Sequence, residues 1–157
     1  MRLRRRTWQC DVCGGTIERP EDGFVEWLHK TTETGEVVEY GPRLVHVRRA
    51  SPHADGCKYD ERRLPPGMGV RDHYLSDLLG PDGLTTCLAF LTRTKLPVED
   101  VGVLIMRLHL RTYEKGHRLL ADARQDDAIP LRSWLPARFA YQEDLLGAMR
   151  HAKRRHR

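Results

Sequence analysis

The pattern of hydrophobic and polar residues changes near residue 72. Before that point apolar residues alternate with polar ones, a period of two that is typical of half-buried β-strands. After it they recur every three or four residues, the spacing of helices that bury one face. The pattern predicts an α+β protein in which a small antiparallel sheet packs with a C-terminal bundle of four to five helices. We assign residues 1–72 to the sheet module and residues 73–157 to the helical region, which ends in a basic tail.

In the sheet module the alternation predicts four short strands. Their expected ranges are residues 7–10, 24–29, 37–40 and 44–48. Thr34-Gly35-Glu36 has the composition of a turn, so we expect the second and third strands to form a hairpin. Residues 58–72 contain Pro65-Pro66-Gly67 and are expected to form an irregular crossing to the helical region.

In the helical region the spacing predicts a short helix over residues 72–79, ended by Gly80-Pro81, and further helices after it. The first of these begins near Asp82 or Thr85, the next ones begin at Pro97 and at Tyr113, and the last begins near Pro136. The last helix carries an apolar seam at alternating steps of four and three residues: Leu135, Phe139, Gln142, Leu146 and Met149. We expect this seam to pack on its own chain, with a homodimer or a partner helix as the alternative.

Cys10 and Cys13 are separated by two residues, a spacing that lets both sulfur atoms turn toward one point. Gly14 and Gly15 follow, and because glycine adopts positive φ values, their amides are able to face the thiolates. Cysteines in a reducing compartment favour metal binding over disulfide formation. A sheet module of this size also buries little apolar surface and needs an additional constraint to fold. We therefore predict one structural zinc ion.

Cys57 is expected to be the third ligand, because it is the other cysteine of the sheet module. Two histidines compete for the fourth position. His46 lies near the end of a predicted strand, and His53 stands four residues before Cys57 in a Pro/Gly-containing loop. We favour His46 because a strand holds a ligand more rigidly than a loop does, and we keep His53 as the alternative. The predicted set is Cys10, Cys13, His46 and Cys57.

The first loop, Cys10-Asp11-Val12-Cys13-Gly14, followed by strands and a second ligand pair, resembles the zinc-ribbon and zinc-knuckle group. The resemblance covers roughly residues 7–60. In this chain the second pair is a histidine and a cysteine, where the commonest ribbon pattern has a second Cys-x-x-Cys. The resemblance implies a structural metal and a role in binding nucleic acid or protein.

The formal net charge of +5 is concentrated at the two ends of the chain. Residues 1–6 and 150–157 hold nine of the 27 Lys and Arg residues and no acidic residue, which leaves 18 basic against 22 acidic residues and a net charge of −4 for residues 7–149. Basic tails of this kind contact nucleic acid or other acidic surfaces; the plainer explanation is that they keep the protein soluble. The arginines expected to meet a nucleic-acid or nucleoprotein partner are Arg4, Arg5, Arg6, Arg48, Arg49, Arg154 and Arg155.

The sequence contains none of the GxxxxGK[ST], GxGxxG, HExxH or GxSxG motifs of common enzyme classes. We therefore expect a non-enzymatic adaptor or regulator. An alternative is a protein-binding regulator or inhibitor, such as one carried by a mobile element, that acts through the acidic body or the last helix. A weaker alternative is a zinc hydrolase, which would need an open coordination position. No apolar run approaches the roughly 18 residues of a membrane span, and no apolar segment follows the basic N-terminus, so we expect a cytoplasmic protein without membrane contact.

Overall fold

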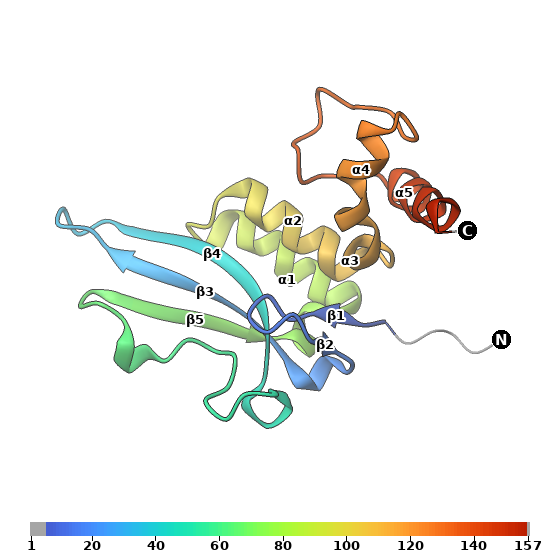
Figure 1. The fold of residues 1–157 in the computed structure, drawn as a ribbon. Helices are drawn as coiled ribbons and strands as arrows, with labels where there is room; N and C mark the ends of the chain where they lie inside the picture. The colour runs from blue at the N-terminus through green and yellow to red at the C-terminus, as the bar shows by residue number, and fades with distance from the viewer. Residues whose placement is uncertain (1–5, 157) are drawn as a thin grey trace. The chain divides into compact units, whose positions relative to one another are not determined.

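The computed structural model describes residues 6–156, and the chain separates into two compact units between Leu104 and Ile105. The strands are β1 (Trp8–Gln9), β2 (Thr16–Ile17), β3 (Gly23–Thr31), β4 (Val37–His46) and β5 (Met68–Tyr74). The α-helices are α1 (Gly80–Arg93), α2 (Val98–His109), α3 (Tyr113–Gly116), α4 (Leu120–Gln125) and α5 (Gln142–Arg155) (Figure 1). Small antiparallel sheets followed by helices confirm the predicted α+β class.

The first unit is built on an antiparallel sheet with the strand order β4-β3-β5. The central strand β3 pairs Val25 with Leu44 on one side and with His73 on the other. Val25 and Trp27 are buried, and the Trp27 ring lies 5.4 Å from the ring of Phe90 in α1. Helix α1 therefore covers the face of the sheet that carries the apolar side chains.

The sheet differs from the sequence prediction in two strands. The predicted strands at residues 37–40 and 44–48 are one continuous strand, β4, in which Gly41 adopts a φ of +68°. The predicted irregular crossing contains β5, and the helix expected over residues 72–79 is only the 3-10 turn η4 (Leu75–Leu78). All the β5 residues are half-buried or exposed. Backbone pairing holds this edge strand in the sheet, so its sequence lacks the alternation of apolar and polar residues from which strands are predicted.

A second, two-stranded sheet pairs Trp8 of β1 with Ile17 of β2, and both side chains are buried. The segment that joins these strands holds the Cys10-x-x-Cys13 turn. Further along, the start of α1 lies very close to η4. A Cβ atom added to Gly83 would lie only 2.1 Å from the carbonyl carbon of Leu78. Only glycine fits at this crossing.

The second unit contains α3, the 3-10 turn η5 (His117–Leu119), α4 and α5. Helix α5 buries Leu145 and Ala148 against this unit, and Gly116 of α3 lets it approach closely, since a Cβ atom there would lie 2.8 Å from Leu145 Cβ. The last helix thus packs on its own chain, as expected. Its buried face is not the predicted seam, because Leu146 is 37% exposed.

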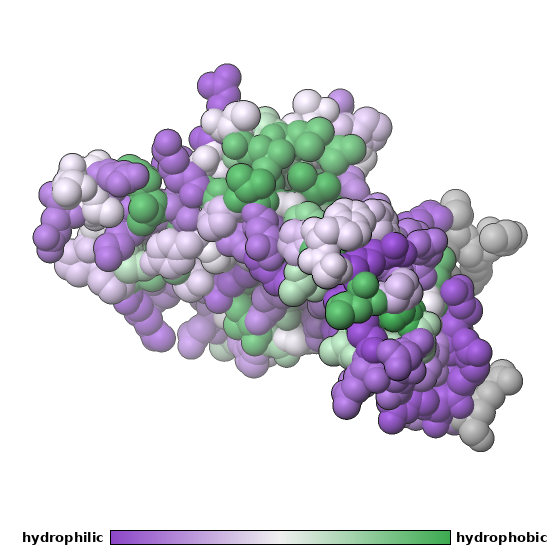
Figure 2. All heavy atoms as spheres, turned by 90° about the horizontal axis from the view of Figure 1, so that it is seen from above, coloured by the Kyte–Doolittle hydropathy of each residue, from purple (hydrophilic) through white to green (hydrophobic). Residues whose placement is uncertain are grey.

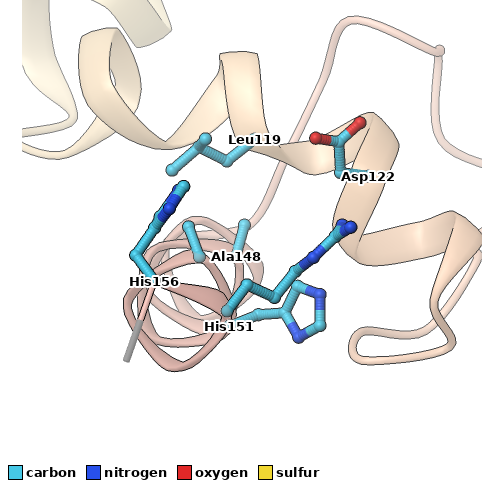
Figure 3. A pocket seen from close by; sticks show the side chains of 7 residues that line it. Leu119, Asp122, Ala148, His151 and His156 are labelled. Atoms are coloured by element: carbon cyan, nitrogen blue, oxygen red, sulfur yellow. The ribbon is translucent and has the colours of Figure 1, made fainter.

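The start of α5 was also predicted too early. Residues 136–139 form a turn in which the Phe139 amide donates to the Pro136 carbonyl at 2.8 Å, and the helix begins at Gln142. At the other end of α5, Asp126 accepts hydrogen bonds from His151 Nε2 at 2.8 Å and from Arg155 at 3.0 Å. A pocket of about 340 Å³ lies beside this end of the helix (Figure 3), lined by Leu119, Asp122, Ala148, His151, Ala152, Arg155 and His156.

The predicted division into residues 1–72 and 73–157 stays a prediction; positions 72 and 73 both belong to β5. Among residues 6–156, no helix combines the length and the apolar character that crossing a membrane requires.

Candidate metal centre

The Cys10-x-x-Cys13 turn is closed by its own backbone. The Cys10 amide donates to the Gly15 carbonyl at 2.8 Å, and the Gly14 amide donates to the Cys10 carbonyl at 3.0 Å. Gly14 has a φ of +70°, and the Gly15 amide points at Cys13 Sγ at 3.4 Å. Of the two glycine amides expected to face the cysteine sulfurs, that of Gly15 does so, whereas that of Gly14 bonds to the Cys10 carbonyl.

His46 is the last residue of β4 and is buried. Its Nδ1 atom lies 3.4 Å from Cys13 Sγ and 3.9 Å from Cys57 Sγ, while its Nε2 atom lies 3.1 Å from the Thr16 carbonyl oxygen. Because a carbonyl only accepts, Nε2 carries the hydrogen and donates it. Nδ1 is then the unprotonated nitrogen that faces the thiols, so it is the atom available to a metal, and the Thr16 carbonyl fixes the orientation of the ring.

The donor atoms of Cys10, Cys13, His46 and Cys57 all lie within 4.8 Å of one another. A tetrahedral zinc ion with bonds of about 2.3 Å to sulfur and about 2.0 Å to nitrogen places its ligands roughly 3.5–3.8 Å apart. The sulfur–nitrogen distances above match this spacing. Three thiols and one imidazole are also the donor types that zinc prefers in structural sites. The four residues fit one zinc ion.

The alternative ligand, His53, is placed elsewhere. Its side chain is exposed in the loop between β4 and Cys57, and its backbone amide donates to Ser51 Oγ at 3.0 Å. The cluster of donors contains His46 and not His53. A histidine anchored at the end of a strand is therefore the one that reaches the thiols, for the reason that favoured it from the sequence.

The thiols of the cluster differ in acidity. Burial raises the pKa of Cys57 to about 11, and the neighbouring Cys10 thiol contributes to this shift. Burial also acts to raise the pKa of Cys10, but hydrogen bonds from the backbone of Cys13, Val12 and His46 and from the Cys13 side chain outweigh it and lower that pKa to about 7. Three adjacent thiolates repel one another, so a divalent cation supplies the charge that lets all of them deprotonate.

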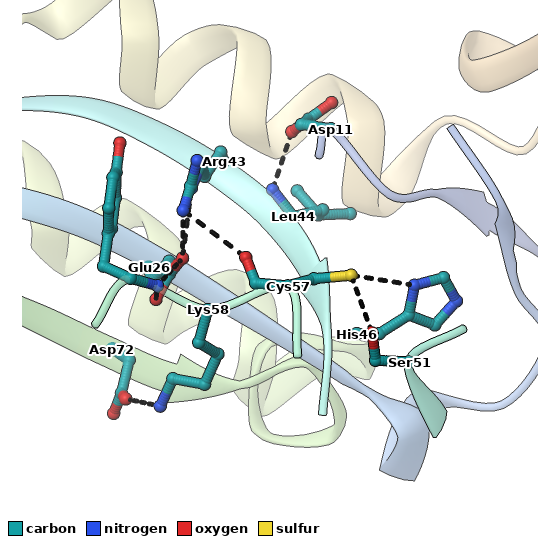
Figure 4. Close-up of polar contacts among 10 residues, drawn as sticks. Asp11, Glu26, Arg43, Leu44, His46, Ser51, Cys57, Lys58 and Asp72 are labelled. Carbon is teal, nitrogen blue, oxygen red and sulfur yellow. Dashed lines mark hydrogen bonds and ion pairs between the residues drawn. The ribbon is translucent and has the colours of Figure 1, made fainter. Parts of the chain in front are cut away.

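Two residues that the sequence interpretation did not single out support the ligands. Asp11, inside the Cys-x-x-Cys turn, accepts a hydrogen bond from the Leu44 amide at 2.7 Å and so ties the turn to β4. The Ser51 hydroxyl lies 3.1 Å from Cys57 Sγ (Figure 4). The sequence offered two signals for these contacts. Asp11 is a polar residue between Cys10 and Cys13, and Ser51 stands six residues before Cys57.

The arginines expected to meet a partner are distributed over both units. Arg48 and Arg49 form the 3-10 turn η2 (Arg48–Ala50) directly after the strand that ends in His46, and both are exposed. Arg154 and Arg155 are exposed on α5 in the second unit. Arg6 lies before β1, with its guanidinium 5.6 Å from the Trp8 ring centroid. The positions predicted at residues 4 and 5 lie outside the described residues.

We compared the chain with protein-family models, with curated proteins and with solved structures, and none of these comparisons gave a match.

Proposed function

We propose that the protein is a non-enzymatic, zinc-stabilised adaptor that binds nucleic acid or a nucleoprotein complex through exposed arginines. One observation carries the proposal: arginines gather on the loops that adjoin the metal ligands. Arg48 and Arg49 follow His46 within three residues, and Arg62 and Arg63 lie on η3 (Glu61–Arg63), a few residues after Cys57. The side chains of Arg62 and Arg63 are 90% and 80% exposed.

The composition of the cluster supports a structural role for the metal. Catalytic zinc sites keep a coordination position open for water or substrate, whereas structural sites use four protein ligands. Three cysteines and one histidine complete a tetrahedral shell and leave no position for water. The zinc-hydrolase alternative is the weaker one for this reason.

The proposal is tested by measuring how a fluorescent single-stranded oligonucleotide binds at increasing salt concentration. Arginine–phosphate contacts release counterions, so the logarithm of the affinity should fall linearly with the logarithm of the salt concentration. A variant in which all the arginines expected to meet the partner are replaced by glutamine (Arg4, Arg5, Arg6, Arg48, Arg49, Arg154 and Arg155) keeps the chain length and should bind about tenfold or more weakly. Affinity that is independent of salt, or unchanged in this variant, would count against the proposal.

A second candidate function is favoured by exposed apolar side chains on the helices of the first unit. Leu88 and Leu91 of α1 are 49% and 39% exposed, and Val98 at the start of α2 is 70% exposed. Figure 2 shows apolar side chains gathered in a patch on one face of the molecule. Such surfaces bind proteins. This candidate predicts a protein complex that survives nuclease treatment and high salt, which a pull-down with and without nuclease would detect.

Two further expectations remain part of the proposal. A homodimer through the last helix would use Leu146, the exposed leucine of α5; light scattering of wild-type protein and of a Leu146→Glu variant tests it. The cytoplasmic location also stays a prediction, and fractionation of expressing cells tests it.

A further inference from the structure

A groove of about 590 Å³ lies next to the metal ligand Cys57, entirely within the first unit. Its volume is in the range of small-molecule sites, about 300–1,000 Å³. The basic side chains that line the groove are Arg43, Arg48, Lys58, Arg62 and Arg63, and the acidic ones are Asp55 and Asp60. The lining is thus predominantly basic, although the body of the chain carries a net negative charge.

The basic residues of the groove are not equally available to a ligand. Arg43 is held by the buried carboxylate of Glu26 at 2.9 Å, and Lys58 is paired with Asp72 (Figure 4). Both therefore serve mainly to build the wall.

Three arginines remain as candidates to contact a ligand. Arg62 and Arg63 share one carboxylate, that of Asp60, at 3.0 and 3.5 Å. Arg48 has no ion-pair partner among residues 6–156. These three arginines and the two aspartates of the lining, Asp55 and Asp60, together carry a net charge of +1.

The wall of the groove is part of the metal loop. Arg43 donates to the carbonyl oxygen of Cys57 at 3.4 Å, and the Tyr59 amide donates to Glu26 at 3.1 Å. The guanidinium of Arg43 also lies 3.5 Å from the centroid of the Tyr59 ring. The segment that carries the groove arginines is thus held on one side by the metal ligand Cys57 and on the other by the buried Glu26.

We propose that this groove binds a phosphate group, which Arg48, Arg62 and Arg63 contact. Guanidinium groups suit this ligand because their N–H donors form paired, charge-assisted hydrogen bonds to phosphate oxygens. The phosphate is either a phosphodiester of a nucleic-acid chain or a free phosphate such as pyrophosphate. The nucleic-acid source rests on the proposed function, and the free-phosphate source does not.

The test uses the full chain loaded with zinc and two probes, a single-stranded oligonucleotide of about 12 nucleotides and inorganic pyrophosphate. The groove variant replaces Arg48, Arg62 and Arg63 with glutamine. A control variant with the same net charge replaces three exposed arginines elsewhere, Arg93, Arg111 and Arg118. Zinc content and melting temperature must match the wild type in both variants.

We expect the groove variant to bind either probe about tenfold or more weakly at roughly 0.1 M salt, and the control variant to stay within about threefold. An Asp60→Asn variant should bind more tightly than the wild type, because it frees two arginines while its side chain still caps the η3 turn. If the arginines only stabilise the fold, the Asp60→Asn variant should not bind the probes more tightly than the wild type.

The outcomes separate this inference from the proposed function. If oligonucleotide binding and pyrophosphate binding are both equal in wild type and groove variant, the groove site is overturned and the proposed function is left standing. Pyrophosphate binding that the groove variant loses, without oligonucleotide binding by the wild type, would support the groove site and overturn the proposed function. Binding of neither probe by the wild type would overturn both.

Discussion

The geometry of the metal centre predicts that replacing His46 with alanine removes zinc, whereas replacing His53 with alanine does not. His46 Nδ1 faces two thiols at 3.4 and 3.9 Å, whereas the His53 side chain is exposed and lies outside the cluster. The two substitutions remove the same side chain from positions seven residues apart, so His53→Ala is a matched control for His46→Ala.

The expected magnitude follows from linkage between metal binding and folding. A ligand that binds only the folded state and is present at about 1,000 times its dissociation constant stabilises that state by about 4 kcal/mol. In a unit of about 100 residues, each kcal/mol shifts the melting temperature by about 4–8 °C. Removing the zinc should therefore lower the melting temperature by about 16 °C or more. The small β1–β2 sheet should be affected first, since it pairs only Trp8 with Ile17 and Gln9 with Thr16.

The assay combines elemental analysis with thermal unfolding. Wild type and His53→Ala should purify with about one zinc ion per chain and melt at the same temperature. His46→Ala should hold much less zinc and melt near the temperature of the chelator-treated wild type. Zinc retained by His46→Ala but lost by His53→Ala would refute the assignment of the fourth ligand. An unchanged melting temperature after complete zinc removal would refute the structural role of the metal.

Three further predictions concern stability, each measured by chemical denaturation. Arg43→Ala should destabilise the first unit by about 3–5 kcal/mol, because it leaves the Glu26 carboxylate buried without its partner, and a double variant that also carries Glu26→Leu should recover part of that loss; equal losses would contradict this. Gly83→Ala should cost more than about 3 kcal/mol because the new Cβ atom would overlap the backbone, whereas Gly35→Ala, at a φ of +81° with open space around it, should cost only about 1 kcal/mol. Tyr113→Phe should cost about 1–2 kcal/mol, since the buried hydroxyl donates to a backbone carbonyl at 2.7 Å; no measurable change would show that this hydrogen bond contributes nothing.

The metal site was largely predictable from sequence because most of its parts leave a local signal. The Cys-x-x-Cys spacing, the two glycines and the strand that ends in His46 are all visible in short windows. The long helices α1 and α2 were predictable for the same reason, since their apolar residues recur at helical spacing. Cys57 has no such local signal. It was assigned to the same metal site as the distant Cys10 only because it is the other cysteine of the sheet module.

The elements that sequence reasoning missed depend on contacts between distant residues. Strand β5 is held by its pairing with β3, as in Val25 with His73 and Leu28 with Val70, while its own side chains stay half-buried or exposed. The buried face of α5 is set by Gly116 of α3, whose lack of a side chain lets Leu145 approach. No periodicity within α5 indicates which residue of another helix leaves room for it.

The loop between His46 and Arg63 connects the metal ligands to the exposed arginines. Because few of its residues are buried, its conformation depends mainly on polar contacts. Between residues 48 and 63 only Cys57 is buried, so the hydrophobic effect contributes little to the conformation of this segment. Its contacts with the rest of the unit are mostly polar: Cys57 lies in the metal cluster, the Tyr59 amide donates to Glu26, and Arg49 donates to the Glu21 carbonyl. Burial raises the pKa of the Glu26 carboxyl even though Arg43 acts to lower it, so this pair orients the loop at a cost in desolvation rather than adding much stability.

Because polar contacts rather than a hydrophobic core hold this loop, removal of the metal should disorder the arginines that it carries even where the β4-β3-β5 sheet survives. We therefore expect chelation to weaken phosphate binding at temperatures well below the melting transition of the first unit. Circular dichroism and oligonucleotide binding, recorded on the same sample during chelator titration, test this. Loss of binding only in step with loss of the sheet would show that the loop has no independent dependence on zinc.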